Sequence, residues 1–130
     1  MKRRIAREKA IQALFQVDRS DIEPEEALEH VLEEEEESDD FLESLVSGTL
    51  ENREAIDERI KAHLQNWSLD RIGNVDRTIL RMGIYEMLYI DEIPMNVTMN
   101  EAIELAKIYG DDNSSRFING VLSKVATSLK

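Results

Sequence analysis

Apolar residues recur with helical spacing along almost the whole of this 130-residue chain, and residues that break helices are rare. Only two prolines and five glycines occur, mostly where a helix would be expected to start, bend or stop. Strand-like alternation is nearly absent. The pattern predicts an all-α fold in which seven helices with short connections form one compact bundle, a single domain over residues 1–130.

Each expected helix carries an apolar stripe that would face a shared core. The first helix is expected over residues 3–17, the second over 21–37 and the longest over 69–90. The others carry their stripes within residues 41–50, 56–64, 102–106 and 117–129. Residues 10–17 and 79–88 are expected to be buried. Gly73 is expected to bend the longest helix near its start, and Trp67 falls in the connection before it.

Several helix ends have recognisable sequence signals. Pro24 suits the first turn of the second helix, and Ser38 can cap the third. The clearest signal is the run from Thr98 to Glu101, which has the pattern of a capping box and predicts a helix start at Thr98. Gly110 is the expected end of that helix.

Charge is distributed very unevenly. The net charge is −12, yet residues 1–9 carry +4, so the other 121 residues carry −16, and residues 21–43 hold thirteen acids without a single Lys or Arg. The basic residues Lys2, Arg3, Arg4 and Arg7 lie at the start of the first helix, where cations oppose the helix dipole at a cost of ~0.3–1 kcal/mol each. We interpret them as an anion-binding end; a merely solubilising terminus is the alternative.

No catalytic or metal-binding pattern is present in the sequence. The chain has no cysteine, no phosphate-binding loop and no dinucleotide-binding glycine motif. His30 and His63 are far apart and fit no ligand spacing, and Ser114-Ser115 has no evident base and suits a helix start. No signal peptide or membrane span is recognisable. We therefore expect a cytoplasmic binding protein that needs no cofactor, and not an enzyme.

The basic end favours nucleic acid as the ligand. Guanidinium groups can contact phosphates and can also stack on bases or hydrogen-bond to them. Charge and periodicity do not decide between RNA and DNA. A small basic end on an acidic body suits a short single strand better than a long duplex.

Three segments together resemble the NusB family of transcription antitermination proteins. They are RRIAREKAIQALF at residues 3–15, IGNVDRTILRMGIYE at 72–86, and a block that runs from Ile93-Pro94 through VTMNEAIELAK at 97–107 to FINGVL at 117–122. Their order and spacing fit the family over essentially the whole chain, and the last block is highly specific.

The resemblance implies a fold of two three-helix bundles that share an elongated helical core. It also implies a function. Members of the family pair with the small-subunit ribosomal protein that acts as NusE. The pair binds boxA, a short single-stranded element of nascent ribosomal RNA transcripts, within RNA polymerase complexes that read through terminators.

The resemblance also implies roles for individual residues. Arg3, Arg4 and Arg7 match the arginine-rich RNA-binding start of the first helix. Phe117 matches an aromatic position near the RNA, although a place on the apolar stripe of its own helix would explain it equally well. Asp70 and Asp76 match acidic positions that face NusE, with exposed helix-surface acids as the alternative.

Two positions depart from the family pattern. Ile5 stands where some relatives continue the arginine run, which makes the basic patch thinner. His63 stands where some relatives have a tyrosine near the RNA, which puts that contact in doubt.

Two other functions remain open from the sequence. A similar helical module forms the amino-terminal part of some ribosomal RNA cytosine methyltransferases, whose catalytic domain carries a cysteine; this chain could come from such an enzyme only as a truncated piece. A helical adaptor that binds proteins alone is the second alternative.

Overall fold

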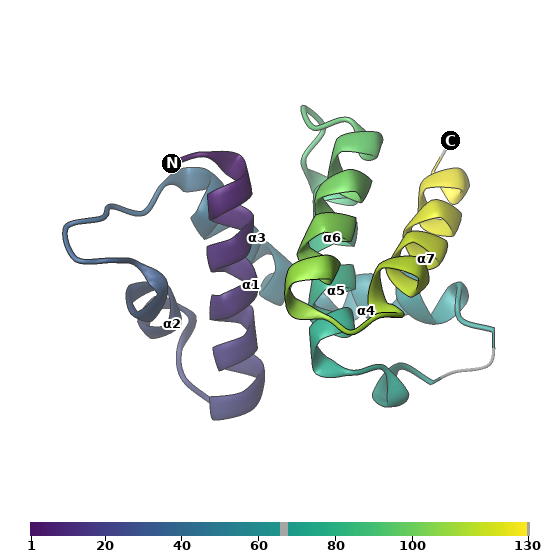
Figure 1. The fold of residues 1–130 in the computed structure, drawn as a ribbon, viewed down its shortest axis with the longest axis horizontal. Coiled ribbons are helices and arrows are strands. Elements are labelled where there is room, and N and C mark those ends of the chain that lie inside the picture. Colours follow the sequence, from purple (N-terminus) through teal and green to yellow (C-terminus); the bar gives the residue numbers. More distant parts are fainter. Residues whose placement is uncertain (66–67, 130) are drawn as a thin grey trace. The chain divides into compact units, whose positions relative to one another are not determined.

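A computed structural model describes residues 1–65 and 68–129 of the protein (Figure 1). Within these ranges there are seven α-helices, one short 3₁₀ turn and no strand. The all-α prediction with seven helices is therefore confirmed. The expectation for Trp67 falls outside the described residues. The chain divides into two compact units, residues 1–51 and 52–130. That residues 1–130 form a single domain stays a prediction.

The first unit is a bundle of three helices. It contains α1 (Arg3–Ser20), α2 (Pro24–Val31) and α3 (Asp40–Glu51), and α1 packs against both of the others. Of residues 10–17, which were expected to be buried, Ile11 is fully enclosed and Leu14 nearly so, whereas Gln12 is exposed and residues 15–17 are half-buried, so the prediction holds only in part. Full burial of such a side chain contributes about 1.5–3 kcal/mol, which offsets the poor electrostatics at the basic start of α1.

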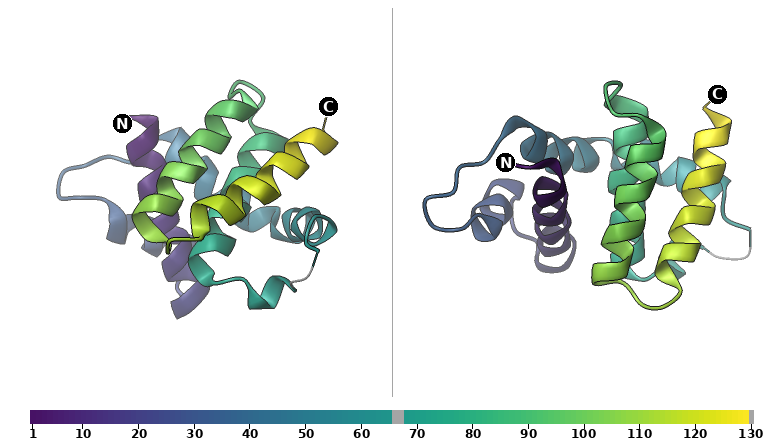
Figure 2. Two further views of the ribbon diagram at one scale, coloured as in Figure 1. Left: turned by 45° about the vertical axis from the view of Figure 1, so that its right-hand side comes forward. Right: turned by 45° about the horizontal axis from the view of Figure 1, so that its top comes forward.

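The second unit is built around α5 (Asn74–Tyr89). This helix packs against α4 (Arg53–Ala62), α6 (Met95–Tyr109) and α7 (Ser114–Ser128). The helices α6 and α7 lie side by side, joined by a short connection (Figure 2). Most of the α5 segment expected to be buried is buried, with Ile79, Leu80 and Ile84 fully enclosed.

Two expected helices are shorter than predicted. The segment 69–90 forms a 3₁₀ turn, η1 (Leu69–Arg71), and then α5, because Ile72 and Gly73 have extended backbones that interrupt the helix. Gly73 thus precedes α5 and does not bend it. The second helix ends at Val31, and the acidic run after it, residues 33–37, lies outside any helix.

The cap of α3 is also different from the prediction. The Oδ1 atom of Asp39 accepts a hydrogen bond from the backbone N–H of Leu42 at 2.9 Å, so Asp39 and not Ser38 caps the helix. The hydroxyl of Ser38 is buried without a hydrogen-bond partner. Three adjacent residues able to cap a helix made the two alternatives indistinguishable from sequence.

The prediction of a helix start at Thr98 was wrong. Helix α6 begins one turn earlier, because the carbonyl of Pro94 accepts hydrogen bonds from Val97 N–H at 3.0 Å and Thr98 N–H at 3.2 Å. Thr98 is 1% exposed, and its hydroxyl donates to Oε1 of the buried Glu86 at 3.1 Å. The threonine therefore serves a tertiary contact between α6 and α5 in place of a cap.

Candidate nucleic-acid and partner interface

The basic start of α1 presents three exposed cations. Lys2 precedes the helix, and Arg3 and Arg4 open it; all three are exposed. The first turn contains no acid, and Lys2 supplies no side-chain cap. Positive charge therefore accumulates on the positive end of the helix dipole, which costs stability and makes this end attractive to phosphate.

Arg7, the fourth predicted cation, is placed differently. Only 3% of it is exposed. Its guanidinium carbon lies 5.3 Å from the ring centroid of Phe41, and that of Arg3 lies 4.6 Å from the same centroid. Both distances are within the range of cation–π attraction. Phe41, in the first turn of α3, therefore holds two of the arginines and belongs to the site.

The starts of α1 and α3 are also joined by an ion pair. Oδ2 of Asp39 lies 3.7 Å from the amino group of Met1, while Oδ1 of the same carboxylate caps α3. One carboxylate thus links the amino terminus to the helix that carries Phe41. The chain end and the arginines are held on the same part of the three-helix unit.

Lys9 does not add to the exposed basic surface. Its Nζ donates to the carbonyl of Val31 at 3.0 Å and pairs with Oε1 of Glu36 at 2.9 Å. The pKa of Glu36 is lowered, first by the backbone N–H of Glu33 at 3.0 Å and then by Lys9. Lys9 therefore ties α1 to the loop after α2, and the basic end depends on Lys2 and the arginines.

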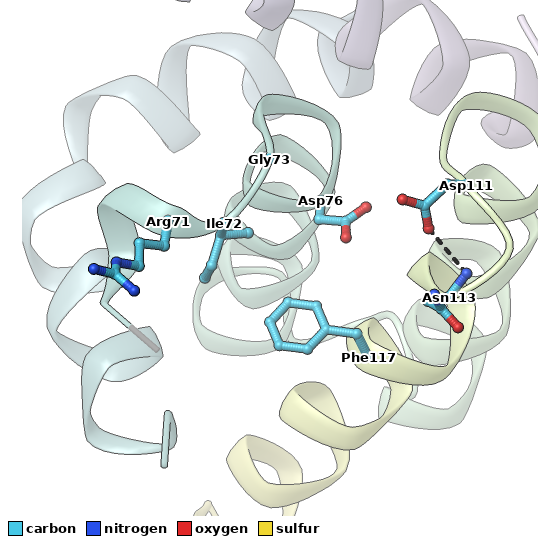
Figure 3. Close-up of a pocket in the computed structure, with 7 residues that line it drawn as sticks. All are labelled: Arg71, Ile72, Gly73, Asp76, Asp111, Asn113 and Phe117. Carbon is cyan, nitrogen blue, oxygen red and sulfur yellow. Dashed lines mark hydrogen bonds between the residues drawn. The ribbon is translucent and has the colours of Figure 1, made fainter. Parts of the chain in front are cut away.

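The second unit contains a pocket of about 460 Å³ (Figure 3). Asp76 in the first turn of α5 and Asp111 before α7 bring their carboxylates to it from two sides, and the ring of half-buried Phe117 forms part of its wall. Oδ1 of Asp111 is held by the backbone N–H of Asn113 at 2.9 Å. Two carboxylates beside an aromatic ring suit a cationic side chain.

Phe117 also lines a smaller hollow of about 240 Å³ between α7 and the end of α4. His63, Arg116 and Lys124 surround it, and at Gly120 an added Cβ would meet nothing within 4 Å. Among the described α-helices, α7 is the one without an Asp or Glu. The hollow is therefore a second, smaller basic surface on an acidic chain.

The structure brings some of the predicted site residues together and leaves others apart. Asp76 and Phe117, predicted to face different partners, line one pocket. Asp70 is exposed on η1 and is not among the residues that line it. The arginines lie in the other unit, and their role in binding RNA stays a prediction, as do those of Phe117, Asp70 and Asp76.

Sequence reasoning missed Phe41, Asp111 and the basic pair Arg116 and Lys124. The lack of acids in α7 was visible in the sequence and could have indicated the pair. No local signal connects Phe41 with the arginines, because the contact joins two helices.

The described part of the chain shows no cluster suited to a metal and no membrane-spanning helix. No three potential ligands among His, Asp and Glu come together within residues 1–65 and 68–129. Over the same ranges, no helix combines the length and the apolar composition needed to cross a bilayer.

Comparison with known proteins agrees with the resemblance seen in the sequence. A curated protein of Bacillus licheniformis, transcription antitermination protein NusB, is 63% identical over 130 residues, with both chains fully covered. A solved structure of NusB from T. maritima has a TM-score of 0.89 and 40% identity, covering 98% of this chain and 92% of that one. A crystal structure of antitermination factors NusB and NusE in complex with dsRNA has a TM-score of 0.85 and 32% identity, with 97% and 96% covered.

The family model agrees with these individual relatives. It is described as the NusB family and matches residues 4–127, which include α1 from its second residue onward, the pocket around Asp76 and the whole of α7 except its last residue. The match extends over both compact units. The chain therefore belongs to the NusB family.

Proposed function

We propose that this protein is a bacterial transcription antitermination factor that pairs with the ribosomal protein NusE and binds boxA-type RNA. It acts by binding and not by catalysis. The name of its B. licheniformis relative and the solved complex of NusB, NusE and RNA support this function. That relative is 63% identical over 130 residues and bears the name of an antitermination protein, which favours an antitermination factor over a methyltransferase module.

The exposed basic start of α1 is the observation that carries the RNA-binding part of the proposal. Lys2, Arg3 and Arg4 concentrate positive charge at one end of a chain whose net charge is −12. Phosphates should therefore be attracted to this end and repelled by most of the remaining surface. The nearly buried Arg7 supports the same cluster through Phe41.

We assign the acidic surface of the second unit to NusE. Ribosomal proteins are basic as a class, and carboxylates at the rim of an interface mainly steer association. Asp76 with the neighbouring Asp111 offers a pocket for a cationic side chain, and Asp70 offers an exposed charge on η1. Phe117 lines this pocket as well as the basic hollow of α7, and it is proposed to contact RNA from there.

Binding of nascent RNA places the protein in the antitermination complex of RNA polymerase. We therefore propose that it acts in the bacterial cytoplasm, where transcription takes place. Its task would be to hold the boxA element of ribosomal RNA transcripts while polymerase passes terminators.

Titration of labelled RNA with and without NusE tests this function. A single-stranded boxA-type RNA, the same RNA as a duplex and a scrambled strand should be compared at several salt concentrations. We expect the boxA strand to bind more tightly than the scrambled strand, and NusE to tighten that binding. The duplex is included because the solved relative holds dsRNA. Equal binding of boxA and scrambled RNA, with no effect of NusE, would contradict the proposal.

A further inference from the structure

Phe41 is the aromatic side chain on which two guanidinium groups meet. Arg3 lies 4.6 Å and Arg7 5.3 Å from its ring centroid, although both arginines come from α1 and the ring comes from α3. Two like charges are thus brought to one ring. The negative faces of the ring reduce their mutual repulsion, which an aliphatic side chain of similar size would not do.

The two arginines differ in what they can reach. Arg7 is 3% exposed, so it cannot lie on a base or a phosphate chain without leaving its place. Arg3 is exposed and one turn nearer the helix start. Arg7 and Phe41 therefore form a support, and Arg3 is the group that the support presents to solvent.

The backbone beneath this support is held as well. Asp39 caps α3 two residues before Phe41 and pairs with the Met1 amino group at 3.7 Å. Together with the packing of α3 on α1, these contacts connect the first turn of α3, which carries the ring, with the start of α1. A long arginine side chain normally loses considerable rotamer freedom when it binds a ligand, and prior ordering reduces that loss.

We infer that Phe41 is a positioning residue of the RNA site, which orders the guanidinium of Arg3 before the RNA arrives. This inference rests on the proposed RNA-binding function and extends it to a residue outside the basic segment. The aromatic character of the ring, and not only its volume, is what the site requires.

The test compares Phe41→Leu with Phe41→Tyr in titrations of boxA-type RNA in the presence of NusE. Leucine keeps an apolar side chain and removes the ring, whereas tyrosine keeps the ring. We expect Phe41→Leu to bind about three- to tenfold more weakly and Phe41→Tyr to stay within about twofold of wild type. The titrations are carried out at a temperature at which thermal unfolding curves show that both variants are fully folded.

A double-mutant cycle separates positioning from general packing. Arg3→Ala should weaken RNA binding less in the Phe41→Leu background than in wild type, because the guanidinium is no longer ordered there. Arg4→Ala is the matched control: Arg4 is exposed and is not among the described cations over the ring, so its effect should be the same in both backgrounds.

Each remaining outcome has a definite meaning. If wild type binds RNA and Phe41→Leu binds equally well or more tightly, the inference is wrong and the proposed function stands. The inference also fails if Phe41→Tyr is as weak as Phe41→Leu, or if Arg3→Ala and Arg4→Ala are both additive with Phe41→Leu. Absence of RNA binding by wild type with NusE would instead overturn the proposed function itself.

Discussion

The two compact units use polar side chains in different places. In the unit of residues 1–51, two ion pairs involve the chain end or a loop: the Met1 amino group pairs with Asp39, and Lys9 reaches the loop residue Glu36, while an exposed contact of 2.8 Å joins His30 of α2 to Gln16 of α1. In the unit of residues 52–130, two buried or half-buried links join one helix to another. Arg81 of α5 holds Asp57 of α4 through two hydrogen bonds of 2.8 and 2.9 Å, and Thr98 of α6 holds Glu86 of α5.

The two kinds of link are expected to have different roles, one in positioning the binding residues and the other in stabilising the fold. Links at helix ends fix where cations stand without supporting the middle of the bundle. Links between helix interiors hold the packing, because breaking them leaves polar groups buried. We therefore expect changes in the first set to cost little stability, and to alter RNA binding where they hold the start of α1. Changes in the second set should lower stability and leave RNA binding unaltered.

The largest loss of stability is expected from Asp57→Ala. It would leave the guanidinium of Arg81, whose side chain is 14% exposed, without its bidentate partner. We expect the free energy of unfolding to fall by about 2–3 kcal/mol. Urea denaturation measures the loss, and RNA affinity of the folded variant should be unchanged.

Glu58→Ala is the matched control for that measurement. The neighbouring Glu58 makes a 3.4 Å pair with Lys61 in which both side chains are more than half exposed. Its loss should change the free energy of unfolding by no more than about 0.5 kcal/mol. Equal losses for the two variants would show that the pair between Arg81 and Asp57 stabilises the protein no more than an exposed ion pair does.

A smaller loss of stability is expected from Thr98→Val. Valine has the shape of threonine but cannot donate to Glu86, so a buried carboxylate oxygen loses a hydrogen bond at a cost of about 1–2 kcal/mol. Thr98→Ser keeps the hydroxyl and should lose less. Thermal unfolding of the two variants distinguishes the explanations. If Thr98→Ser loses more stability than Thr98→Val, the methyl group matters and the hydrogen bond does not.

Substitutions of surface acids in the second unit should weaken NusE binding without lowering stability. The double substitution Asp70→Lys, Asp76→Lys should weaken association with NusE about tenfold, roughly 1.4 kcal/mol, and leave the protein folded. Surface plasmon resonance against immobilised NusE measures it. Glu25→Lys, Glu29→Lys makes the same change in net charge on exposed positions of α2. Equal weakening by both variants would mean that net charge alone acts.

The smallest effect concerns the link between Lys9 and Glu36. Because the pKa of Glu36 is lowered below its ordinary 4.5, the carboxylate stabilises the fold above that pH, and this contribution is lost as pH falls through the lowered pKa. Glu36→Gln should therefore flatten the fall in stability below pH 4.5. Glu34→Gln removes the same charge from the same loop and serves as control. Identical profiles of stability against pH for the two variants would show that the ion pair between Lys9 and Glu36 does not stabilise the fold.

Helical periodicity predicted which segments fold into helices but not all of their ends. The stripes identified Ile56, Ile60 and the centre of α5 as core because burial follows the helical period. Thr98 misled the prediction because a hydroxyl can serve a cap or a tertiary partner equally well, and the sequence does not show Glu86 beside it. Pro94 was the better signal for the start of α6.

The candidate site was visible only where its residues are contiguous. Lys2, Arg3 and Arg4 stand together in an acidic chain, so charge counting found them. Phe41 is brought to the arginines by the packing of α3 on α1, and no periodic or compositional signal indicates that pairing. Burial of Arg7 also depends on packing, since its helical position alone placed it beside the core without showing how little of it is exposed.

The salt dependence of RNA binding tests the central claim, that the start of α1 is the RNA site. Wild type should be compared with Arg3→Ala, Arg4→Ala, Arg7→Ala, and with Arg19→Ala, Arg59→Ala, Lys107→Ala, which removes the same charge from exposed positions elsewhere. For boxA-type RNA with NusE, the first triple variant should bind more weakly. Its slope of log affinity against log salt should shrink by about 0.7 for each phosphate that is no longer neutralised, while the control keeps most of the wild-type slope. Equal affinity and slope for the two triple variants would contradict the claim.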